Sequence, residues 1–471
     1  MHSRLPLQFS MGRPKPSRRR FLRATAKGTL LAGGLCQLPV SSFGTALGAS
    51  TKIRIGLIGV GGKGQHAIGI CNALRHRIEI VALCDVYGGS LQKALALAPV
   101  NRSRVRQYHD FRHLLEQKDV DAVVISTPDH WHALTMIHAC MAGKDVYLEK
   151  PVSHRLEEGR RMVQVARHYG RVIQVGTQQR CGNKKDSLFF RAVDIIRGGV
   201  IGDVTLVKCF TDNNLWPGLG NPPDEEPPRD LDWDRWLGPA PKRTFNPGRF
   251  LHSFRWFWDY SGGKATDWGT HWLDVAQWAM DGQPVGSTDT DHVGTLPISV
   301  SAHGRKFILP DHRETPDTLQ ATVEYPNFLL TYENRVCNDR KRRDGETHGM
   351  EFYGRLGSLF VNRSRLVVTP DGGKAVDGER LPEKSSRGES YRSFIEHMAN
   401  FLDCMESRAK PASDIEIAHR STSTAHLINI ALQRQERIHW DARNERITNS
   451  ESANELLKAH YRAPWKLPNI V

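Results

Sequence analysis

The stretch from residue 53 to residue 85 most constrains what this chain can fold into. An apolar, β-branched run at 53–58 leads directly into a turn rich in glycine, and a helical stretch and a second apolar run at 78–84 follow. A strand, a glycine turn and a helix in this order form the unit that holds the pyrophosphate of a dinucleotide. The residues predicted to line this cofactor site are Gly59, Gly61, Gly62 and Gly64.

Each glycine of the turn has a separate task in such a unit. Gly59 permits the tight turn, Gly61 lets the backbone approach a pyrophosphate, and Gly64 allows the helix to pack closely on the strand. The start of the helix then offers unpaired N–H groups to the phosphates. The sequence therefore predicts a dinucleotide-binding domain near the start of the apolar pattern.

Asp85 indicates which dinucleotide is bound. It comes about 20 residues after Gly64, where a carboxylate can accept hydrogen bonds from both hydroxyls of a ribose and repel a 2′-phosphate. The residues that follow it, Val86-Tyr-Gly88, include no arginine to pair with such a phosphate. We therefore expect NAD as the cofactor, with NADP less favoured.

Strand and helix patterns keep alternating as far as residue 176. Apolar strands are expected at 121–127, 145–149 and 172–176, with helices at 128–142 and 156–169. This alternation predicts a doubly wound parallel sheet, whose ligand crevice lies at the carboxyl ends of the strands. The residues expected at this cofactor edge are Thr127, Pro128, Asp129, His132, Glu149 and Lys150.

The second half of the chain mixes strands and helices. Strand-like segments occur at 204–209, 320–325, 328–333, 349–353, 358–361 and 366–369, and helical ones at 267–280, 391–407 and 416–434. Within the first helix, Asp267, His271 and Asp274 share one face by their spacing. A histidine with a carboxylate one turn away can act as a general base. The spacing fits equally well a helix that Asp267 merely caps.

Eight of the 11 tryptophans lie between residues 216 and 278. The segment 213–260 is also rich in proline, so we expect an irregular arm rather than regular sheet. Aromatic faces on this arm suit carbohydrate, with Arg255, Trp258 and Asp259 as candidate substrate contacts beside Asp274. Packing of the arm on a neighbouring subunit is the alternative.

Three ordered motifs resemble those of one family, the Gfo/Idh/MocA oxidoreductases, which act mainly on sugars and cyclitols. They are Thr127-Pro-Asp-His-Trp-His132, Glu149-Lys-Pro151 and Asp267-Trp-Gly-Thr-His271. The resemblance implies an α/β protein with an N-terminal Rossmann doubly wound parallel sheet and a C-terminal α+β domain. The second domain would hold a large, mostly antiparallel sheet whose open face serves a substrate or a homo-oligomer, a dimer or tetramer. It also implies that Lys150 contacts both the nicotinamide side and a substrate hydroxyl.

Residues 1–50 have the properties of an export signal. They contain eight Lys/Arg and no acid, which leaves +6 of the formal +14 for the other residues. Ser17-Arg-Arg-Arg-Phe-Leu-Arg23 resembles a twin-arginine signal, and a weakly apolar stretch and small residues near 46–48 follow. We expect export of the folded protein by the twin-arginine (Tat) machinery, to the periplasm or another exported location.

Other function classes are disfavoured. No apolar run reaches the roughly 18 residues needed to span a bilayer, so no integral membrane segment is expected after signal removal. The basic run 340–343 is interpreted as a solvated loop tip, so nucleic-acid binding is not expected. The seven cysteines beyond the leader show no Cys-x-x-Cys pattern, and no metal site is predicted.

These observations lead to one functional hypothesis. We expect a twin-arginine signal (1–50), an NAD-binding Rossmann domain (51–176), a substrate and oligomerisation domain (177–440) and a C-terminal extension (441–471). The protein would oxidise a CH–OH group of a sugar, glycoside or cyclitol with tightly bound NAD that is restored within the site. His271, oriented by Asp267, and Lys150 are the expected catalytic residues, and which of His271 and Lys150 accepts the proton first is open. The alternatives are a non-catalytic, cofactor-stabilised glycan-binding or scaffold protein, or a sugar lyase, epimerase or hydrolase that oxidises its substrate transiently.

Overall fold

The structure is a computed structural model, and it describes residues 52–98, 104–181, 187–282, 296–338, 345–373, 376–380 and 383–469. The leader expected over residues 1–50 and the basic run 340–343 lie outside these residues. Within the described part, no helix is both long and apolar enough to cross a membrane.

The first part of the chain folds into a parallel sheet with strand order β3-β2-β1-β4-β5-β6. Its strands are β1 (Ile53–Ile58), β2 (Ile78–Cys84), β3 (Arg106–Tyr108), β4 (Ala122–Ile125), β5 (Asp145–Leu148) and β6 (Ile173–Val175). The helices between them are α1 (Gly62–Ala73), α2 (Gly88–Leu97), α3 (Phe111–Leu115), α4 (His132–Met141) and α5 (Leu156–His168), with a 3₁₀ turn, η2 (Asp129–Trp131), before α4. The predicted doubly wound Rossmann sheet is confirmed. The sequence pattern missed β3 because this strand has three residues and no fully buried position.

The second sheet has strand order β14-β13-β12-β11-β7-β10-β9-β8-β15-β16. Its strands are β7 (Val204–Asp212), β8 (Ser299–Arg305), β9 (Thr318–Glu324), β10 (Leu329–Arg335), β11 (His348–Gly354), β12 (Gly357–Val361), β13 (Arg365–Pro370), β14 (Val376–Arg380), β15 (Ile438–Asp441) and β16 (Arg446–Ile447). Strands β7 and β10 pair in parallel, and the other described pairs of this sheet are antiparallel. This confirms the expected large, mostly antiparallel sheet.

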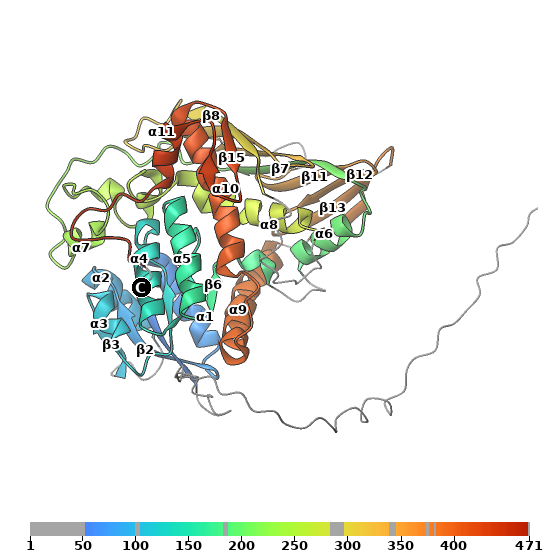
Figure 1. The fold of residues 1–471 in the computed structure, drawn as a ribbon. Coiled ribbons are helices and arrows are strands. Elements are labelled where there is room, and N and C mark those ends of the chain that lie inside the picture. The colour runs from blue at the N-terminus through green and yellow to red at the C-terminus, as the bar shows by residue number, and fades with distance from the viewer. Residues whose placement is uncertain are drawn as a thin grey trace, which may run out of the picture. The chain divides into compact units, whose positions relative to one another are not determined.

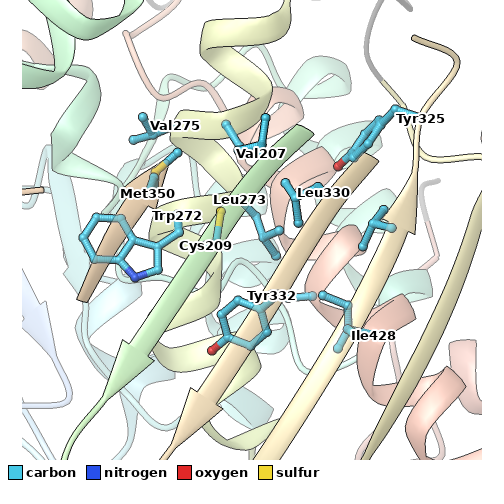
Figure 2. Close-up of a cluster of buried hydrophobic side chains, with 14 of the residues drawn as sticks. Val207, Cys209, Trp272, Leu273, Val275, Tyr325, Leu330, Tyr332, Met350 and Ile428 are labelled. Carbon is cyan, nitrogen blue, oxygen red and sulfur yellow. The ribbon is translucent and has the colours of Figure 1, made fainter. Parts of the chain in front are cut away.

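Helices cover one face of this second sheet. Figure 1 shows α6 (Leu188–Arg197), α8 (Thr270–Met280) and α10 (Ile415–Arg434) along that face. Figure 2 shows the core between them, where Val207, Leu330 and Tyr332 of the strands meet Leu273 of α8 and Ile428 of α10. Along β9 the side chains alternate between buried and exposed, so the opposite face of the sheet points away from this core.

Helix α9 (Glu383–Ser407) returns to the first sheet. Its apolar residues Met398, Phe401 and Leu402 join the cluster that contains Ile55 of β1 and Ile68 of α1. Late residues of the chain therefore complete the core of the NAD-binding half.

The helix that precedes α8 differs from the prediction. Asp267 lies in a π-helical turn, η6 (Ala265–Gly269), rather than in a regular α-helix starting at 267. The hydroxyl of Thr270 donates to the main-chain oxygen of Thr266 (2.7 Å), and the hydroxyl of Thr266 accepts from the N–H of Gly262 (3.1 Å). These side-chain bonds compete with the regular helical ladder and favour the wider turn.

The irregular arm at 213–260 contains α7 (Trp233–Leu237) and two 3₁₀ segments, η4 (Pro247–Arg249) and η5 (Leu251–Trp256). Its aromatic side chains form a core of their own that packs against Val86 and Tyr87. The N–H of Gly88 donates to the main-chain oxygen of Asp230 (2.8 Å), and that of Asp232 donates to Val86 (3.0 Å). The arm is therefore fastened to the Rossmann sheet of its own chain. Three short helical turns complete the described elements: η3 (Gln178–Arg180), α11 (Glu451–Asn454) and η7 (Glu455–Leu457).

Candidate active site

A cavity of about 310 Å³ lies at the carboxyl ends of the parallel strands. Its wall combines the glycine turn, the ends of β2, β4 and β5, the arm, the π-helical turn, Arg363 and Trp465. The sequence-predicted residues that line it are Gly59, Gly61, Gly62, Asp85, Thr127, Pro128, Asp129, Glu149, Lys150, Arg255, Asp267 and His271. Residues predicted from motifs more than 200 positions apart thus meet in one cavity.

The glycine turn fits a dinucleotide. Gly59 has a φ of +80°, and a Cβ there would come within 2.6 Å of the main-chain nitrogen of Thr127. A Cβ at Gly64 would come within 2.2 Å of the main-chain oxygen of Gly59, so helix and turn are in close contact. A Cβ at Gly61 meets nothing within 4 Å, and this residue lines the cavity. The turn therefore leaves room for a phosphate beside the start of α1, which no side chain caps.

Asp85 lies at the end of β2 in the wall of the same cavity. Its Oδ2 accepts from the N–H of Val60 (2.8 Å) and its Oδ1 from the N–H of Tyr87 (3.0 Å). Each oxygen keeps a second lone pair for a ribose hydroxyl. Burial raises the pKa of Asp85 to about 6, against the opposing effect of these N–H bonds. Asp85 therefore has the position and the acceptor capacity to hold a ribose.

Lys150 and Asp267 form an ion pair in the wall of the cavity. The Nζ of Lys150 donates to Oδ1 of Asp267 (2.7 Å) and to its main-chain oxygen (2.6 Å). Burial alone would raise the pKa of Asp267, but the charges of Lys150, Arg255 and Lys264 lower it far below its usual range. Asp267 thus stays ionised and holds the Lys150 ammonium group in place.

His271 has a different partner from the one predicted. Its Nδ1 lies 3.0 Å from Oε1 of Gln179, while Asp267 pairs with Lys150. The prediction that Asp267 orients His271 is wrong, because the π-helical turn directs the carboxylate to the lysine. Donation from Nδ1 to the amide oxygen leaves the lone pair of a neutral ring on Nε2. Burial, together with the charges of Lys150 and Arg363, lowers the pKa of His271 well below its usual value, so the ring is neutral at pH 7.

Three predicted substrate contacts lie outside the cavity wall. Asp274 is fully buried, and its carboxylate accepts from Nε of Arg180 (2.8 and 2.9 Å). One turn beyond His271, it points into the protein core rather than to the cavity. Trp258 is not among the residues that line the cavity, and its main chain bonds Glu314 and His154. Asp259, its neighbour, is paired with Arg243.

His132 lies behind the cavity wall rather than in it. Its ring nitrogens lie 2.7 Å from the main-chain oxygen of Pro151 and 3.0 Å from that of Thr127. The histidine therefore joins the ends of two strands that carry cofactor-site residues. Its predicted direct contact with the cofactor is replaced by this indirect role.

The arm and the C-terminal extension both contribute to the wall of the cavity. Trp236, Phe250 and Phe254 of the arm reach the cavity wall, whereas Trp233 stacks on Trp236 with ring centroids 4.6 Å apart. The arm thus packs mainly within its own chain, and neither the carbohydrate platform nor the subunit contact accounts for most of its aromatic residues.

Trp465 comes from the extension and lines the same cavity. Its ring centroid lies 4.9 Å from that of Trp131, at the start of α4. Arg462 fastens the extension by donating to Asp234 (2.7 Å) and to the main-chain oxygen of Gly238 (3.1 Å). The hydroxyl of Tyr461 donates to Glu158 (2.6 Å). The extension is therefore part of the site.

Sequence reasoning missed Gln179, Arg363 and Trp465. Gln179 follows strand β6, and the same strand-end rule that indicated Thr127 and Glu149 would have found it. Arg363 lies in the hairpin between β12 and β13, and Trp465 lies in the irregular C-terminal extension. Local sequence patterns in these segments do not indicate that they reach a distant cavity.

A glycine turn, an acid at the end of β2 and a Lys–Asp pair beside a neutral histidine define the class of NAD-binding oxidoreductases. Residues 53–177 match a family model described as "Oxidoreductase family, NAD-binding Rossmann fold". Residues 195–295 and 375–467 match the model "Oxidoreductase family, C-terminal alpha/beta domain". The chain belongs to the Gfo/Idh/MocA family of oxidoreductases.

Individual relatives are distant. The uncharacterized oxidoreductase YrbE of Bacillus subtilis is 26% identical over 318 residues, which cover 67% of this chain and 75% of the relative. An inositol 2-dehydrogenase of Salmonella typhimurium is 29% identical over 157 residues, 33% of this chain and 44% of that enzyme. The scyllo-inositol dehydrogenase of Lactobacillus casei, solved with NAD(H) and scyllo-inositol, has a TM-score of 0.57 at 18% identity and covers 83% of this chain and 99% of that one. The last comparison shows the fold alone.

Proposed function

We propose that this protein oxidises a CH–OH group of a sugar, glycoside or cyclitol with NAD. One observation carries the proposal: the Lys150–Asp267 pair and the neutral ring of His271 line the same cavity as the glycine turn. The family membership supports the reaction class, and the names of the inositol dehydrogenases among its relatives support a polyhydroxylated substrate.

His271 and Lys150 have different roles in the proposed reaction. Bound NAD would supply the hydride acceptor. The Nε2 of His271 accepts the proton of the substrate hydroxyl, because its lone pair is free and the ring is neutral at pH 7. Lys150 donates two of its N–H groups to Asp267 and has no lone pair in this form, so it stabilises negative charge on the substrate oxygen instead.

We further propose that NAD is preferred over NADP and stays bound through turnover. The carboxylate of Asp85 supports the preference, because it can accept hydrogen bonds from the ribose hydroxyls of NAD and repels the 2′-phosphate of NADP. The aromatic rings of Trp465 and Trp236 in the cavity wall support retention. Retained NAD must return to its starting state, either by reduction of a second carbonyl compound or by re-reduction of the same substrate. The second route gives a net lyase, epimerase or hydrolase reaction.

A panel of sugars and polyols incubated with the purified protein tests the reaction class. Oxidation shows as absorbance of reduced nicotinamide, and product analysis separates net oxidation from a redox-neutral change. Lys150→Met and His271→Asn should each lower turnover by orders of magnitude while NAD stays bound. Wild-type rates in both variants contradict the assignment. Glycan binding without any turnover in the panel supports a non-catalytic scaffold.

Retention has its own test. Protein recovered from the exported fraction should carry near-stoichiometric NAD and turn over without added cofactor. Protein that arrives empty and needs a continuous supply of NAD is an ordinary dehydrogenase.

We also propose export through the twin-arginine pathway and assembly of a dimer or tetramer through the open face of the second sheet. The leader sequence supports export, and the alternating exposure along β9 supports a sheet face available for assembly. Replacement of Arg18, Arg19 and Arg20 by lysine should retain the protein in the cytoplasm. The mass of the mature protein in solution reports the oligomeric state.

A further inference from the structure

Arg363 is a cation in the cavity wall that the proposed reaction does not use. It lies between β12 and β13, and its guanidinium is 4.9 Å from the ring centroid of Trp268 and 6.0 Å from that of Trp272. Among the described residues, no hydrogen-bond or ion-pair partner of Arg363 is found. Burial lowers the pKa of this guanidinium to about 10, against the opposing effect of Asp267, so it is charged at pH 7.

The other cations of this wall are paired. The Nζ of Lys63 lies 3.2 Å from Glu149, and both Lys150 and Arg255 contact Oδ1 of Asp267, at 2.7 and 3.3 Å. These three cations therefore share two carboxylates, and the fourth, Arg235, lies 3.5 Å from Asp232. Arg363 adds a charge that no carboxylate among the described residues balances. Arg363 is partly exposed and lines the cavity, so its unpaired charge favours a ligand that supplies the opposite charge there.

The position of Arg363 indicates which ligand it faces. It stacks over Trp268, the residue after Asp267, and its charge acts on His271. It is thus placed with the catalytic residues, whereas the phosphates of a dinucleotide belong to the glycine turn at the start of α1. The unbalanced charge lies where the substrate is expected.

The geometry of a guanidinium indicates which chemical groups Arg363 can bind. A planar guanidinium donates two parallel N–H bonds to a carboxylate or a similar oxyanion, and a flat indole behind it fixes its plane. Trp268 provides that surface. A neutral sugar offers hydroxyl groups, which do not balance the charge.

We propose that Arg363 binds an anionic group of the substrate, so that the enzyme acts on a sugar acid whose carboxylate pairs with this guanidinium. The inference rests on the proposed function, since it names the substrate class of the same site. A sulfate ester on the sugar presents the same oxyanion chemistry, and the experiment separates the two sources.

The test compares matched ligands on NAD-loaded protein: glucose and galactose, the corresponding uronates, and the corresponding sulfate esters. Dissociation constants come from calorimetry and kcat/KM from product formation. Wild-type protein should bind one anionic set at least about 10-fold more tightly than the neutral sugars, and the set preferred identifies carboxylate or sulfate. Arg363→Gln should weaken binding of that set by about 10- to 100-fold and leave neutral sugars nearly unaffected.

Two further variants complete the design. Arg363→Lys keeps the positive charge but lacks the two parallel N–H donors of the guanidinium. This variant should recover part of the affinity for the preferred anionic sugars. Arg305→Gln is the matched control, because Arg305 also stacks on an aromatic ring, 4.7 Å from that of Phe307, but lies outside the cavity wall. Arg305→Gln should leave the dissociation constants of both the anionic and the neutral sugars unchanged. Far-ultraviolet circular dichroism should confirm that every variant is folded.

The outcomes separate this inference from the proposed function. If an anionic sugar binds through Arg363 but is not turned over, the anion site is supported and the oxidoreductase assignment is contradicted for this ligand class. Turnover of neutral sugars with no anionic preference, equal losses for both sets in Arg363→Gln, or binding of none of the anionic sugars overturns the inference.

Discussion

The Nζ of Lys150 lies 2.7 Å from Oδ1 of Asp267 and 2.6 Å from the main-chain oxygen of the same residue. Lys150 follows the fifth strand of the Rossmann sheet, and Asp267 lies in the π-helical turn before α8. The pair therefore ties the cofactor half of the chain to the segment that carries His271. It is both a structural link and part of the candidate catalytic machinery.

The two roles of this pair can be separated by a double-mutant cycle. Asp267→Asn should lower the free energy of unfolding by about 3 kcal/mol, because it leaves a buried ammonium group without its counterion. Lys150→Met combined with Asp267→Asn should cost less stability than the sum of the two single changes, by about 0.5–3 kcal/mol, while turnover stays abolished. Denaturant unfolding and turnover assays measure the two quantities. Strictly additive losses of stability contradict a coupled pair.

Gln179 should act as a positioning residue for His271. Gln179→Leu removes the acceptor of Nδ1 and should lower kcat about 10- to 100-fold without weakening NAD binding. Gln179→Glu keeps an acceptor and adds a negative charge, which favours the imidazolium and should move the acid limb of the kcat/KM profile to higher pH. A profile that is identical in wild-type protein and Gln179→Glu excludes this role.

The pH dependence of the wild-type protein follows from the same histidine. The pKa of His271 is well below its usual value, so the ring stays neutral and keeps its free lone pair as the pH falls through the range where free histidine gains a proton. We expect kcat/KM to show no His271-dependent loss between about pH 7 and 6. Titration of the His271 ring by nuclear magnetic resonance provides the check, and a ring that protonates near its ordinary value rules out a neutral base set by burial.

Cofactor choice should weaken in acid. The pKa of Asp85 is about 6, so lowering the pH through this value protonates a group that is ionised at pH 7. The neutral carboxyl repels a 2′-phosphate less and loses acceptor capacity, so the ratio of NAD to NADP affinity should fall between about pH 7.5 and 5.5. Asp85→Asn should show a low ratio that does not change with pH. A ratio that is constant in the wild type contradicts the role of Asp85.

Trp465 should slow the release of NAD. Trp465→Ala opens the cavity wall beside Trp131 and should raise the NAD dissociation rate about 10-fold, as measured by stopped-flow displacement. Trp216→Ala is the matched control, because this arm residue is 56% exposed and does not line the cavity. Equal rates for the two variants rule out closure by the extension.

The difference between what the sequence predicted and what the structure contains has a physical pattern. Gly59, Asp85 and Lys150 follow strands in a repeating unit, so local patterns place them at one sheet edge. The predicted partner of Asp267 is wrong because its spacing to His271 holds only in a regular helix, whereas the hydroxyls of Thr266 and Thr270 favour a π-helical turn. Arg363 and Trp465 reach the cavity only through tertiary packing, which local periodicity does not encode.

The fastening of residues 461–465 to the cofactor half sets the order in which the protein can mature. The Rossmann strands leave the ribosome early, but α9 begins about 210 residues after β6 and Trp465 follows about 290 residues after it. Neither the first core nor the cavity wall is complete until then. Nascent protein would expose an unfinished apolar surface on the first sheet during most of translation. Cofactor loading is therefore expected only after residue 465 has been synthesised.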